Sequence, residues 1–316
     1  MEKIVIITGP TGVGKSATAI ELAKMLNGEL VNADSRQVYQ YMDIGTAKPT
    51  EEEMLGVPHH LLSLIKPHQV FSVAMYQQSA KKAIADILSR HNVPIIVGGS
   101  GQYIWSLVEG WNIPEASPDG KLRGLLEKLA KTTEGRAELL KQLQELDAVT
   151  YERIDKSNMR RIVRAIEACK QQSIPFSKQR SKSGSNYDIL LIGLTMERSL
   201  LYQKVDERVD NMLKNGLLQE TQYLLQMYPH KHSVFATIGY KQLSAYINNQ
   251  SSLQEAVQRI KFETHRYIRQ QYTWFKPSDE RINWFTLHKD NRDQKTIVII
   301  KEFIESFLNS RTKGVS

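Results

Sequence analysis

The sequence has 316 residues, 41% of them apolar, and a formal net charge of +8 at pH 7. This size allows about two domains of roughly 150 residues with buried cores, and together with the apolar content it excludes a chain that is disordered as a whole. A single cysteine, Cys169, excludes an internal disulfide and a cysteine-based zinc site, and no apolar run approaches the roughly 20 residues that span a bilayer. We therefore expect a cytoplasmic protein without a membrane anchor or a signal peptide.

The first predicted elements are a strand at 4–8, a glycine-rich loop and a helix at 17–26. The loop fits the pattern G-x-x-x-x-G-K-[ST] with Gly9, Pro10, Thr11, Gly12, Val13, Gly14, Lys15 and Ser16. In such a loop, backbone N–H groups at a helix N-terminus bind phosphate oxygens, Lys15 neutralises charge, and the Ser16 hydroxyl can join a Mg²⁺ shell. ATP or any diphosphate would suit it, so the loop alone does not separate an ATPase, a kinase and an enzyme with a diphosphate leaving group.

A second strand is predicted at 29–33 and ends at Asp34. A helix capped by Ser72 follows through Arg90, and a buried strand at 93–97 then ends in a turn that contains Ser100. This alternation of helix and strand predicts a parallel α/β sheet. The Asp34 carboxylate would then project from the sheet edge that carries the phosphate loop. Alternatively, Asp34 and Ser35 only cap the next turn.

After Pro114 the pattern becomes helical, and no strand is predicted before 189–194. Helices at 200–213, 253–275 and 297–308 follow, with an edge strand at 282–285. We therefore predict a P-loop NTPase-like parallel sheet with flanking helices and an inserted all-helical domain. The predicted catalytic core comprises residues 1–115 and 188–316, and the insertion comprises 116–187.

Positive charge gathers within the predicted insertion. Residues 153–182 hold nine basic side chains against two acidic ones. Such a run is compatible with a solvated helix face, which confers solubility, and with a surface for a polyanionic partner. The charge pattern alone leaves both interpretations open.

Seven ordered blocks resemble the tRNA dimethylallyltransferases, also called tRNA isopentenyltransferases. Besides the phosphate loop, these are DSRQVY at 34–39, MDIGTAKP at 42–49, PHHLL at 58–62, VGGSGQY at 97–103, RIVRAIE at 161–167, IGYK at 238–241 and TWF at 273–275. The blocks extend over nearly the whole chain, and such an ordered series is far more specific than a P-loop alone.

The resemblance implies that a dimethylallyl group passes from dimethylallyl diphosphate to N6 of the adenosine at tRNA position 37, next to the anticodon, and that diphosphate is released. It implies Mg²⁺ as cofactor and Asp34 as catalytic base, and we expect Lys15 to stabilise the leaving diphosphate. Ser100 stands where the family usually has a threonine that helps to hold the diphosphate or the tRNA. We further expect a monomer.

The resemblance also implies contacts to the anticodon stem-loop of tRNA, with the target base flipped out of its stack. The implied tRNA-binding residues are Asp34, Ser35, Arg36, Gln37, Ser100, Arg123, Met159, Arg160, Arg161, Ile162, Val163 and Arg164. The helix with Arg266 and Arg269 matches a further tRNA-facing region, although His265 and Gln270 replace residues that are often basic there.

Three other functions remain open on the sequence. A P-loop kinase would use Asp34 as base towards a hydroxyl acceptor but would not explain the basic insertion. A relative that prenylates free adenine nucleotides would share the catalytic residues without needing that insertion. A binding module without catalysis would not explain why Lys15, Ser16 and Asp34 occur together.

Overall fold

A computed structural model of the chain describes residues 1–113, 120–172, 174–179, 181–228, 233–288 and 294–310. The chain divides into two compact units, one formed by Met1–Val108 with Ser185–Ser316 and the other by Glu109–Gly184. Within the described residues, no helix has both the length and the apolar character needed to cross a membrane.

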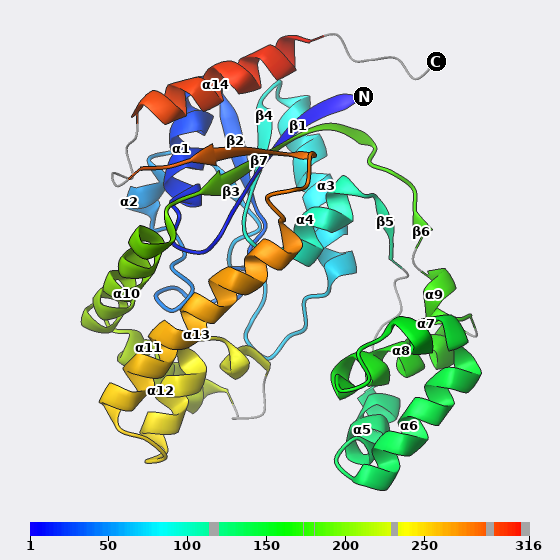
Figure 1. The fold of residues 1–316 in the computed structure, drawn as a ribbon. Helices are drawn as coiled ribbons and strands as arrows, with labels where there is room; N and C mark the ends of the chain where they lie inside the picture. Colours follow the sequence, from blue (N-terminus) through cyan, green and yellow to red (C-terminus); the bar gives the residue numbers. More distant parts are fainter. Residues whose placement is uncertain (114–119, 173, 180, 229–232, 289–293, 311–316) are drawn as a thin grey trace. The chain divides into compact units, whose positions relative to one another are not determined.

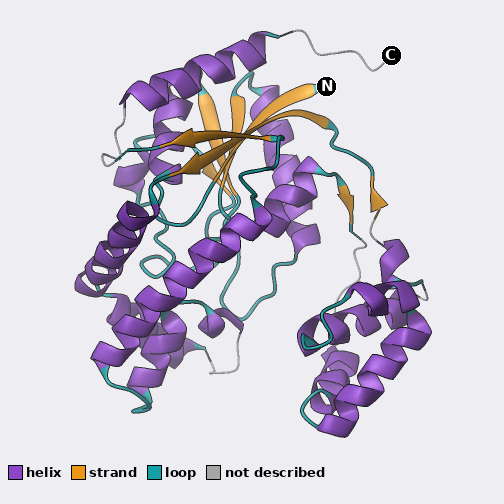
Figure 2. Ribbon diagram, in the orientation of Figure 1, coloured by secondary structure: helices purple, strands orange, loops and turns teal. Residues whose placement is uncertain are grey.

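The first unit is built on one six-stranded sheet (Figures 1 and 2). Its strands are β1 Glu2–Thr8, β2 Gly28–Asn32, β3 His59–His60, β4 Val93–Val97, β7 Tyr187–Thr195 and β8 Ile282–Thr286. Their order is β3-β2-β4-β1-β7-β8, and every neighbouring pair is parallel. The predicted parallel α/β sheet and the predicted edge strand near 282 are therefore confirmed.

Helices bury this sheet, which explains why its central strand is continuously apolar. All side chains from Ile4 to Ile7 are fully buried, as expected for a parallel strand with both faces covered. Helix α1, Lys15–Leu26, and helix α14, Gln294–Asn309, pack together and share one core cluster with Val5 and Ile7. Helix α3, Val73–Ser89, packs on β2, on β4 and on helix α4, Gly101–Val108. As predicted, the Ser72 side chain caps α3 by accepting a hydrogen bond from the Met75 N–H.

A second group of helices extends from the carboxyl edge of the sheet. It contains α10 Arg198–Lys214, α11 Leu217–Met227, the 3₁₀ turn η1 Ser233–Ala236, α12 Tyr240–Ile247 and α13 Leu253–Trp274. Their apolar faces form a cluster with Val38, Tyr39 and Met42, which lie in the long connection after β2. The same connection carries the one-turn helix α2, Glu51–Met54. The segment that follows Asp34 thus folds against the C-terminal helices.

The second unit is helical apart from one short ribbon. Its helices are α5 Gly120–Leu129, α6 Thr133–Leu146, α7 Ala148–Arg153, α8 Met159–Gln172 and α9 Phe176–Gln179. The ribbon pairs β5, Trp111–Asn112, with β6, Ser181–Lys182, in antiparallel register. The prediction of no strand between Pro114 and residue 189 was therefore wrong, because β6 forms there by pairing with β5, about seventy positions away and beyond the reach of local patterns. The ribbon belongs to the unit Glu109–Gly184, whereas the sequence placed the boundaries at 116 and 187.

Candidate functional site

The phosphate loop joins β1 to α1, as predicted, and its backbone requires glycine. Gly9, Gly12 and Gly14 have φ values of 145°, 85° and 110°. At Gly9, a Cβ atom would also lie 2.3 Å from the Leu194 carbonyl oxygen on β7. Gly14 caps α1 in the left-handed conformation without a side-chain hydrogen bond. The first N–H groups of α1 therefore remain available to an anion.

Lys15 lies at the start of α1 with its ammonium folded over the loop. Its Nζ donates a hydrogen bond to the Pro10 carbonyl oxygen at 2.9 Å. Burial lowers the pKa of Lys15 to about 8, the charge of Asp34 raises it, and the charge of Arg208 lowers it. Such a lysine gains from any anion that enters the loop, because the anion stabilises its charged form.

Asp34 lies just beyond β2 in a turn held by its neighbours. The Asp34 N–H donates to Asn32 Oδ1 at 3.0 Å, and Asp34 Oδ1 accepts from the Arg36 N–H at 2.8 Å. The Asn32 amide in turn donates to the Asp34 carbonyl and to the Leu61 carbonyl. The second carboxylate oxygen, Oδ2, has no hydrogen-bond partner within the described part of the chain. Asp34 therefore organises its turn, as the alternative interpretation expected, and still offers a free carboxylate oxygen.

Ser100 is hydrogen-bonded to the Asp34 turn. Its Oγ accepts from the Ser35 N–H at 2.9 Å, and its own N–H donates to the Ala33 carbonyl. Since β2, β4 and β1 are neighbours in the sheet, Asp34, Ser100 and the phosphate loop all follow the carboxyl ends of adjacent strands. This is the edge at which open parallel sheets bind ligands.

Arg208 is a site residue that the sequence analysis missed. It lies on α10, and its charge acts on both Lys15 and Asp34. Burial lowers the pKa of Arg208, although Asp34 and Glu53 oppose that shift. Within the described residues its guanidinium makes no hydrogen bond or ion pair, so its donors are available to an anion. The sequence carries no distinct signal for it, because an arginine beside an apolar helix face, here next to the buried Val205 and Val209, is also common where it only covers apolar surface.

Gln271 was also missed, and it joins two loops of the site. It lies on α13 with 3% of its surface exposed. Its Oε1 accepts from the Thr11 N–H at 2.8 Å, and its Nε2 donates to the Gly99 carbonyl at 3.3 Å. The phosphate loop and the turn that carries Ser100 are thereby fixed to one side chain, more than 170 positions away in the chain.

The residues at the loop fit a Mg²⁺ ion that a diphosphate would bring. The Ser16 side chain is exposed, and its hydroxyl has no hydrogen-bond partner among the described residues. Over all the residues that the structure describes, no group of three or more His, Cys, Asp or Glu side chains could hold a metal. Mg²⁺ commonly takes few protein ligands beside phosphate oxygens and water, so a single hydroxyl is compatible with it.

The basic segment of the second unit is divided between its core and its surface. On α8, Arg160, Arg161 and Arg164 are exposed. Ile162 and Val163, which were also expected to contact tRNA, are 0% and 4% exposed and belong to the core of this unit. The expectation of side-chain contacts from these two residues is therefore corrected: helical periodicity turns them inward, whereas the three arginines lie on the surface.

Two further predicted contact residues have partners within the second unit. Arg123 Nη2 lies 2.6 Å from Oε2 of Glu167, a buried carboxylate, so this arginine balances a charge in the interior. Met159 packs against the core of the same unit. Neither side chain is wholly available to an RNA, in contrast to the three arginines of α8.

On α13, Arg266 and Arg269 are exposed, as a surface for RNA requires. Arg269 donates to the Tyr202 hydroxyl at 3.2 Å. His265 stacks on the Tyr202 ring and lies 2.9 Å from the Asp206 carboxylate, so its partners are side chains of the neighbouring helix α10.

Two adjacent histidines, His59 and His60, lie in β3. They contact the Val57 carbonyl and the Glu29 carboxylate respectively.

Comparisons with known proteins agree on one family. A family model described as IPP transferase matches residues 37–278. The tRNA dimethylallyltransferase of Carboxydothermus hydrogenoformans is 43% identical over 304 residues, 95% of this chain and 97% of that protein. The homologous enzyme of Dehalococcoides mccartyi is also 43% identical, over 95% of this chain and 92% of its own length.

Solved structures extend the similarity to the fold. The full-length tRNA isopentenylpyrophosphate transferase of Bacillus halodurans is 38% identical, with a TM-score of 0.73 over 98% of this chain and 97% of its own. A eukaryotic dimethylallyltransferase acting on tRNA is 27% identical, with a TM-score of 0.82 over 97% of this chain and 80% of its own. On this evidence the chain belongs to the IPP transferase family.

Proposed function

We propose that the protein transfers a dimethylallyl group from dimethylallyl diphosphate to N6 of the adenosine at tRNA position 37 and releases diphosphate. The observation that carries this proposal is the arrangement of Lys15, Asp34 and Ser100 at the carboxyl ends of three adjacent parallel strands. One edge thereby offers an anion site and a carboxylate base together, which an alkyl transfer to an amine requires.

The diphosphate would occupy the loop at the N-terminus of α1. Negative charge develops on the oxygen between C1 and the α-phosphorus as the C1–O bond breaks, and the loop N–H groups and the Lys15 ammonium stabilise that charge. Arg208 would bind the same group with its guanidinium, which has no partner among the residues that the structure describes. A Mg²⁺ ion bound through the Ser16 hydroxyl would supply further positive charge to the phosphates.

The acceptor is an exocyclic amine. Its nitrogen forms a bond to C1 of the dimethylallyl group, while the C1–O bond breaks and diphosphate leaves with the electron pair. The nitrogen then loses one proton, and Oδ2 of Asp34 would accept it. Ser100 would orient the diphosphate or the tRNA with its hydroxyl hydrogen, because its oxygen already accepts from the Ser35 N–H.

The exposed arginines of α8 support a polyanionic substrate. Arg160, Arg161 and Arg164 would contact phosphates of the anticodon stem-loop, and the turn from Asp34 to Gln37 would meet the loop bases. We also propose that the protein acts as a monomer in the cytoplasm.

A labelled-donor assay tests this function. The protein receives Mg²⁺ and labelled dimethylallyl diphosphate with either unmodified tRNA or free AMP, and the position of the label is determined. Label in tRNA alone is expected, and Asp34→Asn should reduce the rate by a factor of about 10² to 10⁴, as expected for loss of a general base. Label in AMP would assign the protein to nucleotide prenylation instead. If neither acceptor is labelled, transfer from labelled ATP to a small acceptor would identify a kinase.

A further inference from the structure

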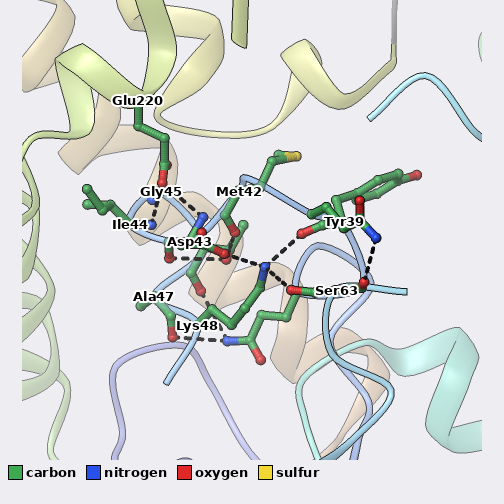
Figure 3. A network of polar contacts seen from close by, with 12 residues as sticks. Tyr39, Met42, Asp43, Ile44, Gly45, Ala47, Lys48, Ser63 and Glu220 are labelled. Carbon is green, nitrogen blue, oxygen red and sulfur yellow. Dashed lines mark hydrogen bonds and ion pairs between the residues drawn. The ribbon is translucent and has the colours of Figure 1, made fainter. Parts of the chain in front are cut away.

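The connection after Asp34 contains a network of polar contacts that the proposed chemistry does not use. Loop 42–48 lies in it, and Figure 3 shows Glu220 directed at this loop and the Lys48 ammonium directed from the loop towards Tyr39 and Ser63. Glu220 contacts backbone N–H groups of the loop, and Lys48, at the end of the loop, contacts the Tyr39 carbonyl outside it.

Glu220 binds the loop with both carboxylate oxygens. Oε2 accepts from the N–H groups of Asp43 at 2.9 Å and Ile44 at 2.8 Å, and Oε1 accepts from the Gly45 N–H at 3.0 Å. Three successive N–H groups aimed at one carboxylate form an anion-binding nest. Hydrogen bonds to an ionised acceptor are about twice as strong as neutral ones. Glu220 also lies in the first turn of α11, where the helix dipole favours a negative charge.

Tyr240 completes this arrangement. Its hydroxyl donates to Glu220 Oε1 at 2.6 Å, and its ring is fully buried. Burial raises the pKa of Tyr240, and the neighbouring Glu220 charge raises it further, so the phenol remains a donor. The ring also defines the loop sterically, because a Cβ atom at Gly45 would lie 2.5 Å from it. Tyr240 and Glu220 therefore fix the position of the loop backbone together.

Lys48 ties the other end of the loop. Its ammonium donates to the Tyr39 carbonyl at 2.7 Å, to the Ser63 hydroxyl at 2.8 Å and to the Asp43 carboxylate. All three N–H groups of the ammonium are thereby used, and 7% of the side chain is exposed. A backbone held at both ends has few alternative conformations.

The held loop determines how Gln37 is presented. The Gln37 side-chain amide donates one hydrogen to the Thr46 carbonyl at 3.2 Å and the other to the Ala47 carbonyl at 3.0 Å. These two acceptors fix the orientation of the amide, because a flipped amide would place its oxygen against both carbonyls. The Gln37 side chain has no N–H group left to donate, and its Oε1 has no hydrogen-bond partner among the described residues.

We infer that Glu220 and Tyr240 are positioning residues that set Gln37 as a hydrogen-bond acceptor for the exocyclic amino group of a base in the RNA loop. The inference rests on the proposed function, which places Gln37 at the RNA. Glu220 holds residues 43–45, the next two carbonyls hold the Gln37 amide, and Oε1 is the polar atom of that side chain which the described residues leave for the substrate. Gln37 thus distinguishes a base with an amino group at its position from one without it.

The first part of the test measures the loop without catalysis. Glu220→Gln replaces one carboxylate acceptor by an amide NH₂ group, so the N–H groups of Asp43, Ile44 and Gly45 should exchange with solvent at least about tenfold faster than in the wild type. The matched control is Glu302→Gln, which removes an exposed carboxylate on α14. Unchanged exchange at these three amides in the Glu220 variant would overturn the positioning role.

The second part uses RNA. Anticodon stem-loops are prepared in which each loop base with an amino group, other than the target, is replaced in turn by its counterpart without that group. With wild-type protein, one replacement should lower kcat/KM by about 3- to 10-fold, the value of one hydrogen bond. Gln37→Ala should lower kcat/KM on the parent RNA similarly and show no further loss with that replacement.

Glu220→Gln and Tyr240→Phe should reproduce this loss of discrimination while the KM for dimethylallyl diphosphate stays unchanged. The control Glu302→Gln should discriminate between the RNAs as the wild type does. A purely structural role would instead lower the rate on all RNAs alike. The inference is overturned if no replacement depends on Gln37, or if Glu220→Gln discriminates as the wild type does. Failure of the proposed function is distinguishable, because the wild type would then transfer no label to the parent RNA.

Discussion

Two cations and one carboxylate define the catalytic edge at the scale of single residues. Burial lowers the pKa of both Lys15 and Arg208, the charge of Arg208 lowers the pKa of Lys15 further, and the charge of Asp34 opposes the shift of both. Without a bound anion this grouping holds two positive charges near one negative charge. The negative charge of an entering diphosphate compensates the excess positive charge. The arrangement therefore favours binding of the donor and stabilises the leaving group.

Arg208→Ala should weaken binding of pyrophosphate by about 10- to 100-fold, because hydrogen bonds to charged groups contribute about 1.5–3 kcal/mol. Titration calorimetry with pyrophosphate measures the change. Arg198→Ala is the matched control, since Arg198 is an exposed arginine on the same helix. Equal affinities for the two variants would remove Arg208 from the diphosphate site.

The pKa of about 8 for Lys15 predicts a pH dependence of pyrophosphate binding. Below pH 8 the ammonium is charged before the anion arrives, whereas above pH 8 it must first take up a proton. Affinity should therefore fall by up to about tenfold per pH unit above pH 8. Lys15→Arg keeps its charge throughout this range and supplies the baseline for the titration of pyrophosphate itself. Parallel pH profiles for the wild type and this variant would contradict the prediction.

At the scale of one element, helix α8 has one face that packs in the core and another that is exposed to a partner. Ile162, Val163 and Ile166 lie in the core of the second unit, and Arg160, Arg161 and Arg164 lie on the surface. The spacing of 3.6 residues per turn makes this division unavoidable for such a sequence. The basic segment is therefore a solvated helix face, and the proposed function gives that face an RNA backbone as partner.

Replacing Arg161 and Arg164 together by alanine should weaken tRNA binding and reduce the slope of log K against log salt by about 1.5, the contribution of two phosphate contacts. Binding measured at several salt concentrations gives this slope. Replacing Lys131 and Lys141, two exposed lysines of the same unit outside the basic segment, is the control and should change the slope less. The same change in both double variants would show that only total charge matters.

At the scale of the whole molecule, a buried carboxylate joins the strands β2 and β3 to the end of α3. Glu29 has 3% of its surface exposed and contacts Arg90, Asn92 and His60. Burial alone would raise the pKa of Glu29, but the hydrogen bonds from these three side chains lower it from 4.5 to about 2. Its ionised form therefore stabilises the folded sheet.

This shift predicts acid sensitivity. The contribution of Glu29 is fully present above pH 4.5 and is lost as the pH falls towards 2, with a total on the order of 3 kcal/mol at 1.36 kcal/mol per pKa unit. Urea unfolding between pH 6 and pH 3 should show the decline, and Glu29→Gln should reduce its slope. Glu302→Gln, at an exposed position, should show the same decline in stability between pH 6 and pH 3 as the wild type. If Glu29→Gln declines as steeply as the wild type, other carboxylates govern acid unfolding.

Contiguous signals were sufficient for much of the site. The phosphate loop is an unbroken pattern, and the strands that precede Gly9, Asp34 and Gly98 were recognisable from short apolar runs. Because parallel strands share a carboxyl edge, their order along the chain already placed Lys15, Asp34 and Ser100 together. The burial of Ile162 and Val163 was also accessible from helical periodicity, and the resemblance to the family obscured it.

The remaining features depended on the tertiary structure. Arg208, Gln271 and Glu220 act on residues more than 160 positions away, and the Tyr240 ring packs against Gly45, in a loop whose conformation no local pattern specifies. The β5–β6 ribbon likewise exists only because two distant segments meet. The sequence by itself determined the elements and the chemistry at their ends, since those follow from local periodicity and contiguous motifs. Only the tertiary structure decided which side chains hold the loops between them, because hydrogen bonds to backbone groups depend on distances that the chain acquires when it folds.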